Sequence, residues 1–209
     1  GVLRRMYELG VRMMTLTWNH ENELASPQRN PGGVLVPQTE KGLTGKGFEF
    51  LAEMERMHMI VDVSHLSDKG FWDIVEHGTR PFAASHSNCR ALAPHTRNLT
   101  DEMIHVMAEK GGLVGLNYCS GFLDDQPRPE LCRSTTALMA RHAAHFKQVG
   151  GIEIIGLGSD FDGIGGKLEM GDCSKLPLLA DALRKEGFTE DELEQIFFRN
   201  AQRFFEENL

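Results

Sequence analysis

Two short apolar runs, IVDVSH at residues 60–65 and PFAASH at residues 81–86, decide the fold class of this 209-residue chain. Each run is typical of a buried strand and ends in Ser-His. Residues 68–77 between them carry apolar side chains at helical spacing, and Ser67 before them is a good helix N-cap. A strand, a helix and a second strand in this order form a parallel βαβ unit. A third run, IIGLGSD at residues 154–160, has the same form but ends in a carboxylate.

The alternation of helix and strand extends over the whole chain. The pattern predicts strands at residues 11–18, 60–64, 81–85, 113–117 and 152–158. It predicts helices at residues 1–9, 44–58, 68–77, from 101 onward, 135–149, 176–186 and 190–207. Residues 19–42 are rich in Asn, Pro and Gly and read as a long loop, a feature that is usually functional in a compact domain.

These elements predict a single α/β domain over residues 1–209 with about five parallel strands. A closed (β/α)8 barrel needs eight strands. The sheet is therefore either an open doubly wound sheet or the C-terminal portion of a (β/α)8 TIM barrel. Residues 1–9 read as a helix already under way, with neither an initiator Met nor a signal peptide, so we expect a chain that is cut at its N-terminus.

The composition excludes several classes of function. Hydrophobic residues make up 41% and charged residues 25% of the chain, and the net charge is −8, so we expect a globular protein that does not bind nucleic acid through its phosphates. No apolar run approaches the roughly 18 residues that a membrane segment needs. The four cysteines lie far apart and predict neither a disulfide scaffold nor a thiolate zinc site.

The strand ends carry the candidate chemistry. Carboxyl ends of parallel strands open onto one face, so His65, His86 and Asp160 should meet there. Two imidazoles and a carboxylate suit a catalytic zinc site, in which Asp160 would hold the attacking water and move its proton to the leaving group. Arg97, in the loop after His86, could pair with a substrate carboxylate.

Other polar residues of this sequence receive no catalytic role. No G-x-S-x-G elbow surrounds Ser64 or Ser85, so neither is expected to be a nucleophile. The remaining seven histidines have no strand-end placement, and we expect them to be solvated or packed in the core: His20, His58, His77, His95, His105, His142 and His145.

The chain also resembles the membrane (renal) dipeptidase family, zinc peptidases of the amidohydrolase superfamily. The resemblance runs through essentially the whole chain. The segments that carry it are LGVRMMTLT at 9–17, GLTGKG at 42–47, VDVSH at 61–65, SHSN at 85–88, TRNL at 96–99 and GLGSDFDG at 156–163.

The resemblance implies a (β/α)8 barrel with two Zn²⁺ ions bridged by a glutamate, and hydrolysis of dipeptides by a metal-activated hydroxide. It places His65 and His86 on the histidine ligands of one zinc, Asp160 on the catalytic aspartate, and Arg97 on the arginine that holds the substrate carboxylate. Some relatives accept a D-residue at the second position or open β-lactams. Family members are often dimers, which makes a homodimer a possible partner arrangement.

The sequence departs from the family pattern at several places. The His-x-Asp pair that ligates the other zinc is absent, as is the bridging Glu. Trp18 stands where relatives usually have a substrate-polarising histidine, and His20 lies two residues further on. Cys119 follows Asn117-Tyr118 where relatives often have Asn-Phe-Tyr.

These departures leave three hypotheses. In the first, the parent protein is a zinc-dependent dipeptidase and residues 1–209 alone are inactive. In the second, it is another amidohydrolase-type metal hydrolase, such as a phosphoesterase or deaminase; those enzymes typically use a carbamylated lysine, and no Lys ends a strand here. In the third, the chain is a non-catalytic binding relative that lost the first metal site.

Overall fold

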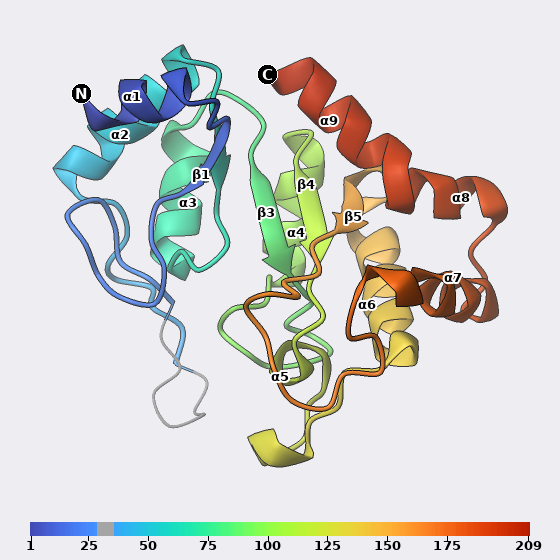
Figure 1. Ribbon diagram of the computed structural model, residues 1–209. Coiled ribbons are helices and arrows are strands. Elements are labelled where there is room, and N and C mark those ends of the chain that lie inside the picture. The colour runs from blue at the N-terminus through green and yellow to red at the C-terminus, as the bar shows by residue number, and fades with distance from the viewer. Residues whose placement is uncertain (29–35) are drawn as a thin grey trace.

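Five parallel strands form one sheet, and their order in space is their order in the chain (Figure 1). The computed structural model describes residues 1–28 and 36–209, so the part of the predicted loop at 29–35 lies outside the described residues. The strands are β1 (Met13–Thr15), β2 (Ile60–Asp62), β3 (Ala83–Ser87), β4 (Leu113–Leu116) and β5 (Ile155–Leu157). A doubly wound sheet would reverse its order at a switch point, whereas sequential order is that of consecutive units of a (β/α)8 barrel.

Helices connect the strands and flank the sheet (Figure 1). They are α1 (Val2–Glu8), α2 (Gly45–Arg56), α3 (Asp68–His77), α4 (Asp101–Glu109), α5 (Ser120–Leu123), α6 (Thr136–Gly150), α7 (Leu176–Lys185), α8 (Glu190–Glu194) and α9 (Asn200–Asn208). Five of them begin at a hydroxyl that accepts a backbone N–H of the first turn, which satisfies one of the free donors there. These N-caps are Thr44, Ser67, Thr100, Thr135 and Thr189.

The structure confirms the predicted elements, but it shortens four of the strands and moves the strand predicted at 81–85 two residues along the chain, to 83–87. Residues 152–154 form a 3₁₀ turn instead of the first half of the last strand, because the Asn200 side chain donates to the carbonyls of Ile152 and Ile155 and holds the turn closed. The predicted helix at 190–207 is interrupted by a π-helical turn, Gln195–Arg199, between α8 and α9. The sequence reading missed the short helix α5.

The two faces of the sheet differ in what they bury. Val61, Val114 and Ile155 belong to the main core together with the helices. On the other face, the first residues of β2, β3 and β4 form a separate cluster with Phe204 of α9: Ile60, Ala83 and Leu113. Figure 1 shows α9 at the end of the sheet from which the strands start.

Two further expectations concern membrane segments and cysteines. Across the described residues, no helix is both long and apolar enough to cross a bilayer. All four cysteines are free thiols: Cys89, Cys119, Cys132 and Cys173.

Candidate metal centre

The two predicted histidine ligands face each other at the carboxyl ends of neighbouring strands. The Nε2 atoms of His65 and His86 are 3.0 Å apart, and the ring centroids are 5.0 Å apart. His86 lies within β3, but β2 ends at Asp62, so His65 lies three residues past its strand instead of at its last position. The fold therefore brings together two side chains that are 21 residues apart in the chain.

The other nitrogen of each ring is engaged by a fixed polar neighbour. His65 Nδ1 lies 3.0 Å from Asn19 Oδ1, and His86 Nδ1 lies 2.7 Å from Ser85 Oγ. An amide oxygen can only accept, so His65 Nδ1 carries the proton and His65 Nε2 presents a lone pair. Hydrogen bonds of this kind fix the tautomer and the orientation of metal-binding histidines.

The pair fits two ligands of a single divalent ion. Zinc–nitrogen bonds of about 2.0–2.1 Å in a tetrahedral site separate two ligand nitrogens by about 3.3 Å, close to the separation seen here. A complete ligand set is not formed: among residues 1–28 and 36–209, no group of three His, Cys, Asp or Glu side chains is arranged to hold a metal. The predicted metal roles of His65 and His86 thus stay predictions.

Both imidazoles are held neutral. Burial, with smaller contributions from the nearby Arg97 guanidinium and the His86 ring, lowers the pKa of His65 to about 3. Burial and Arg97 also lower the pKa of His86, although Asp62 and Asp160 oppose the shift. A neutral imidazole is the form that binds a metal, so at physiological pH no proton has to leave either ring first.

Asp160 and His65 adopt a backbone conformation that side chains rarely tolerate. Their φ angles are +65° and +70°, in the left-handed region. For non-glycine residues this conformation costs about 1–2 kcal/mol, and such strain collects at functional sites. Asp160 lies three residues past the end of β5, and its Oδ2 accepts a hydrogen bond of 3.2 Å from the Asn117 side chain.

Arg97 is a buried cation with free donors. Its side chain lies over the ring of Phe122, and the residue is only 8% exposed. Among the described residues its guanidinium donates from Nη2 to the carbonyl of His86, at 3.3 Å, while Nε has no partner. Burial lowers the pKa of Arg97 to about 10, against the opposing charges of Asp62 and Asp160, so it remains charged at neutral pH.

A cavity of about 610 Å³ joins these groups. His65, Asp160 and Arg97 all line it, with Trp18 and Phe122 as apolar walls. A smaller adjoining hollow of about 380 Å³ is lined by His65, His86 and Asp160 together. The four residues predicted from the sequence therefore line two hollows that share Trp18, His65 and Asp160, although their individual roles remain predictions.

The sequence reading missed two contributors to this cavity. His95 was expected to be solvated or in the core, but it lines the cavity, where its Nδ1 accepts the backbone N–H of Arg97 at 3.1 Å. Burial lowers the pKa of His95 to about 4. Cys119 also lines the cavity. Nothing in the spacing of loop residues 88–99 could have marked His95, because no strand ends there.

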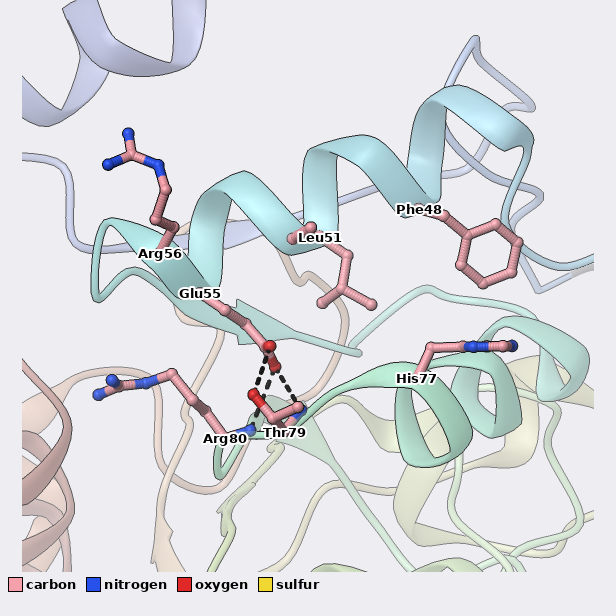
Figure 2. Close-up of a pocket in the computed structure, with 8 residues that line it drawn as sticks. Phe48, Leu51, Glu55, Arg56, His77, Thr79 and Arg80 are labelled. Carbon is pink, nitrogen blue, oxygen red and sulfur yellow. Dashed lines mark hydrogen bonds between the residues drawn. The ribbon is translucent and has the colours of Figure 1, made fainter.

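A second hollow, of about 700 Å³, lies on the outside of the molecule between α2 and the end of α3 (Figure 2). Glu55 points into it but accepts hydrogen bonds from Thr79 and from the backbone of Arg80. The other arginine on its rim, Arg56, is paired with Glu53. This hollow lies near the end where β2 and β3 begin, and in barrels of this kind that end serves stability rather than catalysis.

Comparison with known proteins adds a family to this geometry. The family described as membrane dipeptidase (peptidase family M19) matches residues 1–208. A Klebsiella pneumoniae protein, described as an uncharacterised protein in the pqqA 5' region, is 36% identical over 203 residues, covering 96% of this chain and 73% of the relative. An uncharacterised dipeptidase of Schizosaccharomyces pombe is 35% identical over 205 residues, covering 97% of this chain and 48% of the relative.

Two solved structures share the fold. A metallopeptidase from Rhodobacter sphaeroides, bound to a phosphinate mimic of the dipeptide L-Ala-D-Ala, superposes with a TM-score of 0.91 at 32% identity, over 100% of this chain and 59% of that chain. The dipeptidase AC, a metallopeptidase of family M19, also gives a TM-score of 0.91 at 32% identity, over 99% and 61%. The chain thus spans about half to three fifths of the length of most of these relatives.

Proposed function

Because the chain belongs to the membrane dipeptidase family, peptidase family M19, we propose that the protein hydrolyses dipeptides at the cavity lined by His65, Asp160 and Arg97. The observation that carries this proposal is the facing pair of Nε2 atoms at 3.0 Å. Two neutral imidazoles that face each other at this distance are suited to share a cation. Zinc is the cation we propose, in keeping with the family.

His65 and His86 would hold one zinc ion. When bound, zinc polarises a carbonyl and lowers the pKa of a water molecule to about 7. Asp160 would take the proton of the attacking water and pass it to the leaving amine, since its carboxylate opens onto both parts of the cavity. Its hydrogen bond from Asn117 keeps the carboxylate turned in one direction.

Arg97 would bind the C-terminal carboxylate of the dipeptide. A buried guanidinium with an unpartnered Nε can form two parallel hydrogen bonds to a carboxylate. The Rhodobacter relative is bound to a mimic of L-Ala-D-Ala, so we propose dipeptides with either an L- or a D-residue at the second position as substrates.

We also propose that residues 1–209 form a single domain, a portion of the barrel, and that the remaining metal ligands lie outside them. The described residues form no group of three ligands, so we expect this chain to bind zinc without appreciable turnover. The test compares the 209-residue chain with the complete encoded protein, using L-Ala-L-Ala and L-Ala-D-Ala with and without added zinc.

The expected result is turnover by the complete protein that EDTA abolishes and zinc restores, and little turnover by the 209-residue chain. Rapid hydrolysis by the chain alone would show that no further ligands are needed. A phosphotriester assayed in parallel tests the alternative that the protein is a phosphoesterase of the amidohydrolase type. Faster hydrolysis of the phosphotriester than of the dipeptides would contradict the dipeptidase proposal.

Binding without turnover is the second candidate function, and the incomplete ligand set among the described residues is the observation that favours it. The same assay separates the two candidates. A complete protein that binds zinc and dipeptides but releases no amino acids would be a binding relative.

A further inference from the structure

A buried carboxylate lies next to the histidine pair, at the carboxyl end of β2. Asp62, the last residue of β2, is 3% exposed. Its Oδ1 accepts the backbone N–H groups of Ser64 and Ser85, each at 2.9 Å. Its Oδ2 accepts the hydroxyls of Thr15 at 2.8 Å and Ser85 at 2.5 Å. A single side chain thus connects β1, β2 and β3.

The Ser85 hydroxyl lies between this carboxylate and a predicted metal ligand. Ser85 Oγ is 2.5 Å from Asp62 Oδ2 and 2.7 Å from His86 Nδ1. A hydroxyl has one proton to donate, and an ionised carboxylate can only accept. Ser85 therefore donates to Asp62, and His86 Nδ1–H must donate to Ser85 Oγ. The remaining ring nitrogen, His86 Nε2, then carries a lone pair that faces His65.

We propose that Asp62 is a positioning residue for the metal centre, acting through Ser85 to fix the tautomer and orientation of His86. This inference rests on the proposed function, in which His86 is a metal ligand. A second contact supports the orientation, because the backbone N–H of His86 donates to Ser64 Oγ at 3.1 Å. Carboxylates that orient metal-binding histidines commonly raise metal affinity about 10–100-fold.

The hydrogen bonds of Asp62 fall into two groups, those that support the fold and the one that positions His86. Its bonds to the two backbone N–H groups would hold the strand ends together without the Ser85 hydroxyl. The hydroxyl contact adds the link to the imidazole. Ser85→Ala removes that link and leaves both backbone bonds, whereas Asp62→Asn changes the direction of the link. In the latter variant the new amide can donate to Ser85 Oγ, so that Ser85 donates to His86 Nδ1 and the proton moves to Nε2.

The test reads the tautomer of His86 by ¹H–¹⁵N NMR of the metal-free protein at pH 8. We expect the proton on Nδ1 in the wild type, on Nε2 in Asp62→Asn, and no strong preference in Ser85→Ala. Asp73→Asn is the matched control, because Asp73 is also 3% exposed and its carboxylate also accepts a backbone N–H, that of Leu43 at 2.8 Å. We expect this control to keep the wild-type tautomer.

A proton on Nε2 in the wild type, or an unchanged tautomer in both Asp62→Asn and Ser85→Ala, would overturn the inference. If Asp62→Asn does not fold, the wild type and Ser85→Ala still decide it. Zinc titration then tests the role toward the metal, with an expected rise in Kd of about 10–100-fold in Asp62→Asn and no change in Asp73→Asn. A wild type that has the expected tautomer but binds no zinc would contradict the proposed function and leave the positioning of His86 standing.

Discussion

Arg97, the residue proposed to bind the substrate carboxylate, carries its charge at a cost to stability. Its guanidinium is buried, and burial lowers its pKa to about 10. A shift from 12.5 to about 10 corresponds to roughly 3 kcal/mol by which folding disfavours the charge. Met has a similar length and no charge to desolvate.

We therefore expect Arg97→Met to raise the free energy of unfolding by about 1–3 kcal/mol, because the variant no longer has to bury a charged guanidinium. The same variant should no longer bind a dipeptide carboxylate. Urea unfolding monitored by circular dichroism measures the change. Arg5→Met, at an arginine whose side chain is 69% exposed, is the control and should leave stability unchanged. A less stable Arg97→Met protein would mean that the guanidinium is paired in a way the described contacts do not include.

His142 should make stability depend on pH. It is 1% exposed, its Nδ1 accepts the N–H of Cys89 at 3.1 Å, and burial lowers its pKa to about 4. Between pH 6.5 and 4 the unfolded chain binds a proton at this residue that the folded chain does not. The contribution of His142 to the free energy of unfolding is therefore fully present above pH 6.5. It is lost as the pH drops toward 4, which lowers the free energy of unfolding by about 3 kcal/mol.

Unfolding free energies measured at pH 7.5 and pH 4.5 test this expectation. His142→Gln should lose less stability over that interval than the wild type, although it starts from a lower value. His105→Gln, at a side chain that is 62% exposed, should keep the wild-type difference. Equal pH dependence in all three proteins would exclude His142 as the responsible group.

At the residue scale, strand-end placement was enough to select His65, His86 and Asp160 and to bring them to one cavity. It was not enough to find Asp62. A charge inside the run IVDVS was the available signal, because a carboxylate in a buried strand has to be hydrogen-bonded. Which groups bond it depends on the register of β1 and β3, which the sequence does not specify.

The loop at residues 88–99 is the element that carries Arg97, and an ion pair helps to hold it together with hydrogen bonds of the Asn98 side chain. Arg90 forms two hydrogen bonds to Asp68, at 2.7 and 2.8 Å, with side chains that are 11% and 9% exposed. Its remaining bonds go to the carbonyls of Thr96 at 3.2 Å and Asn98 at 2.8 Å, on either side of Arg97. The guanidinium thus fixes the backbone of the candidate carboxylate site.

Arg90→Lys keeps the charge but loses the planar fork, so we expect it to cost about 1–3 kcal/mol of stability and to loosen this loop. Hydrogen exchange of the amides at residues 95–99 should become faster, with little change in β4. Arg184→Lys is the control, because its pairs with Asp181 and Glu190 are exposed and should be worth less than about 1 kcal/mol. Unchanged exchange in the loop would show that Arg90 does not hold it.

Helices were predicted more accurately than strands because their N-caps are explicit in the sequence. Ser67 and Thr100 mark the first turns of α3 and α4, as observed. Four of the five strands were predicted too long and β3 was predicted two residues too early, since an apolar run does not show where ladder pairing starts and stops. The 3₁₀ turn before β5 depends on Asn200, a residue 45 positions away, so no local pattern could reveal it.

At the scale of the whole molecule, α9 closes the end of the sheet opposite the candidate site. Phe204 is 1% exposed and packs against the first residues of three strands. We expect Phe204→Ala to cost about 3–5 kcal/mol, because the deleted ring leaves a cavity there. Thermal unfolding of both variants measures this loss. Phe198→Ala, at a ring that is 58% exposed, should leave the free energy of unfolding nearly unchanged. Similar losses in both variants would contradict this packing role.

The alternation of helices and strands was recoverable from the sequence pattern, but it did not fix the order of the strands in space. The choice between an open doubly wound sheet and a portion of a barrel therefore rested on the family resemblance alone. Under both topologies, the sequence pattern placed His65 and His86 at the ends of neighbouring strands. The register pairs that run β1-β2-β3-β4-β5 without reversal decide for the barrel type. Long-range pairing of this kind is set by tertiary packing, not by local propensity.

The most direct test of the central claim is a zinc-edge anomalous difference map from crystals of the protein grown with zinc. We expect one strong peak within about 2.1 Å of both His65 Nε2 and His86 Nε2, facing the cavity with Asp160. A peak bound elsewhere, or imidazoles that turn away from a shared ion, would contradict it.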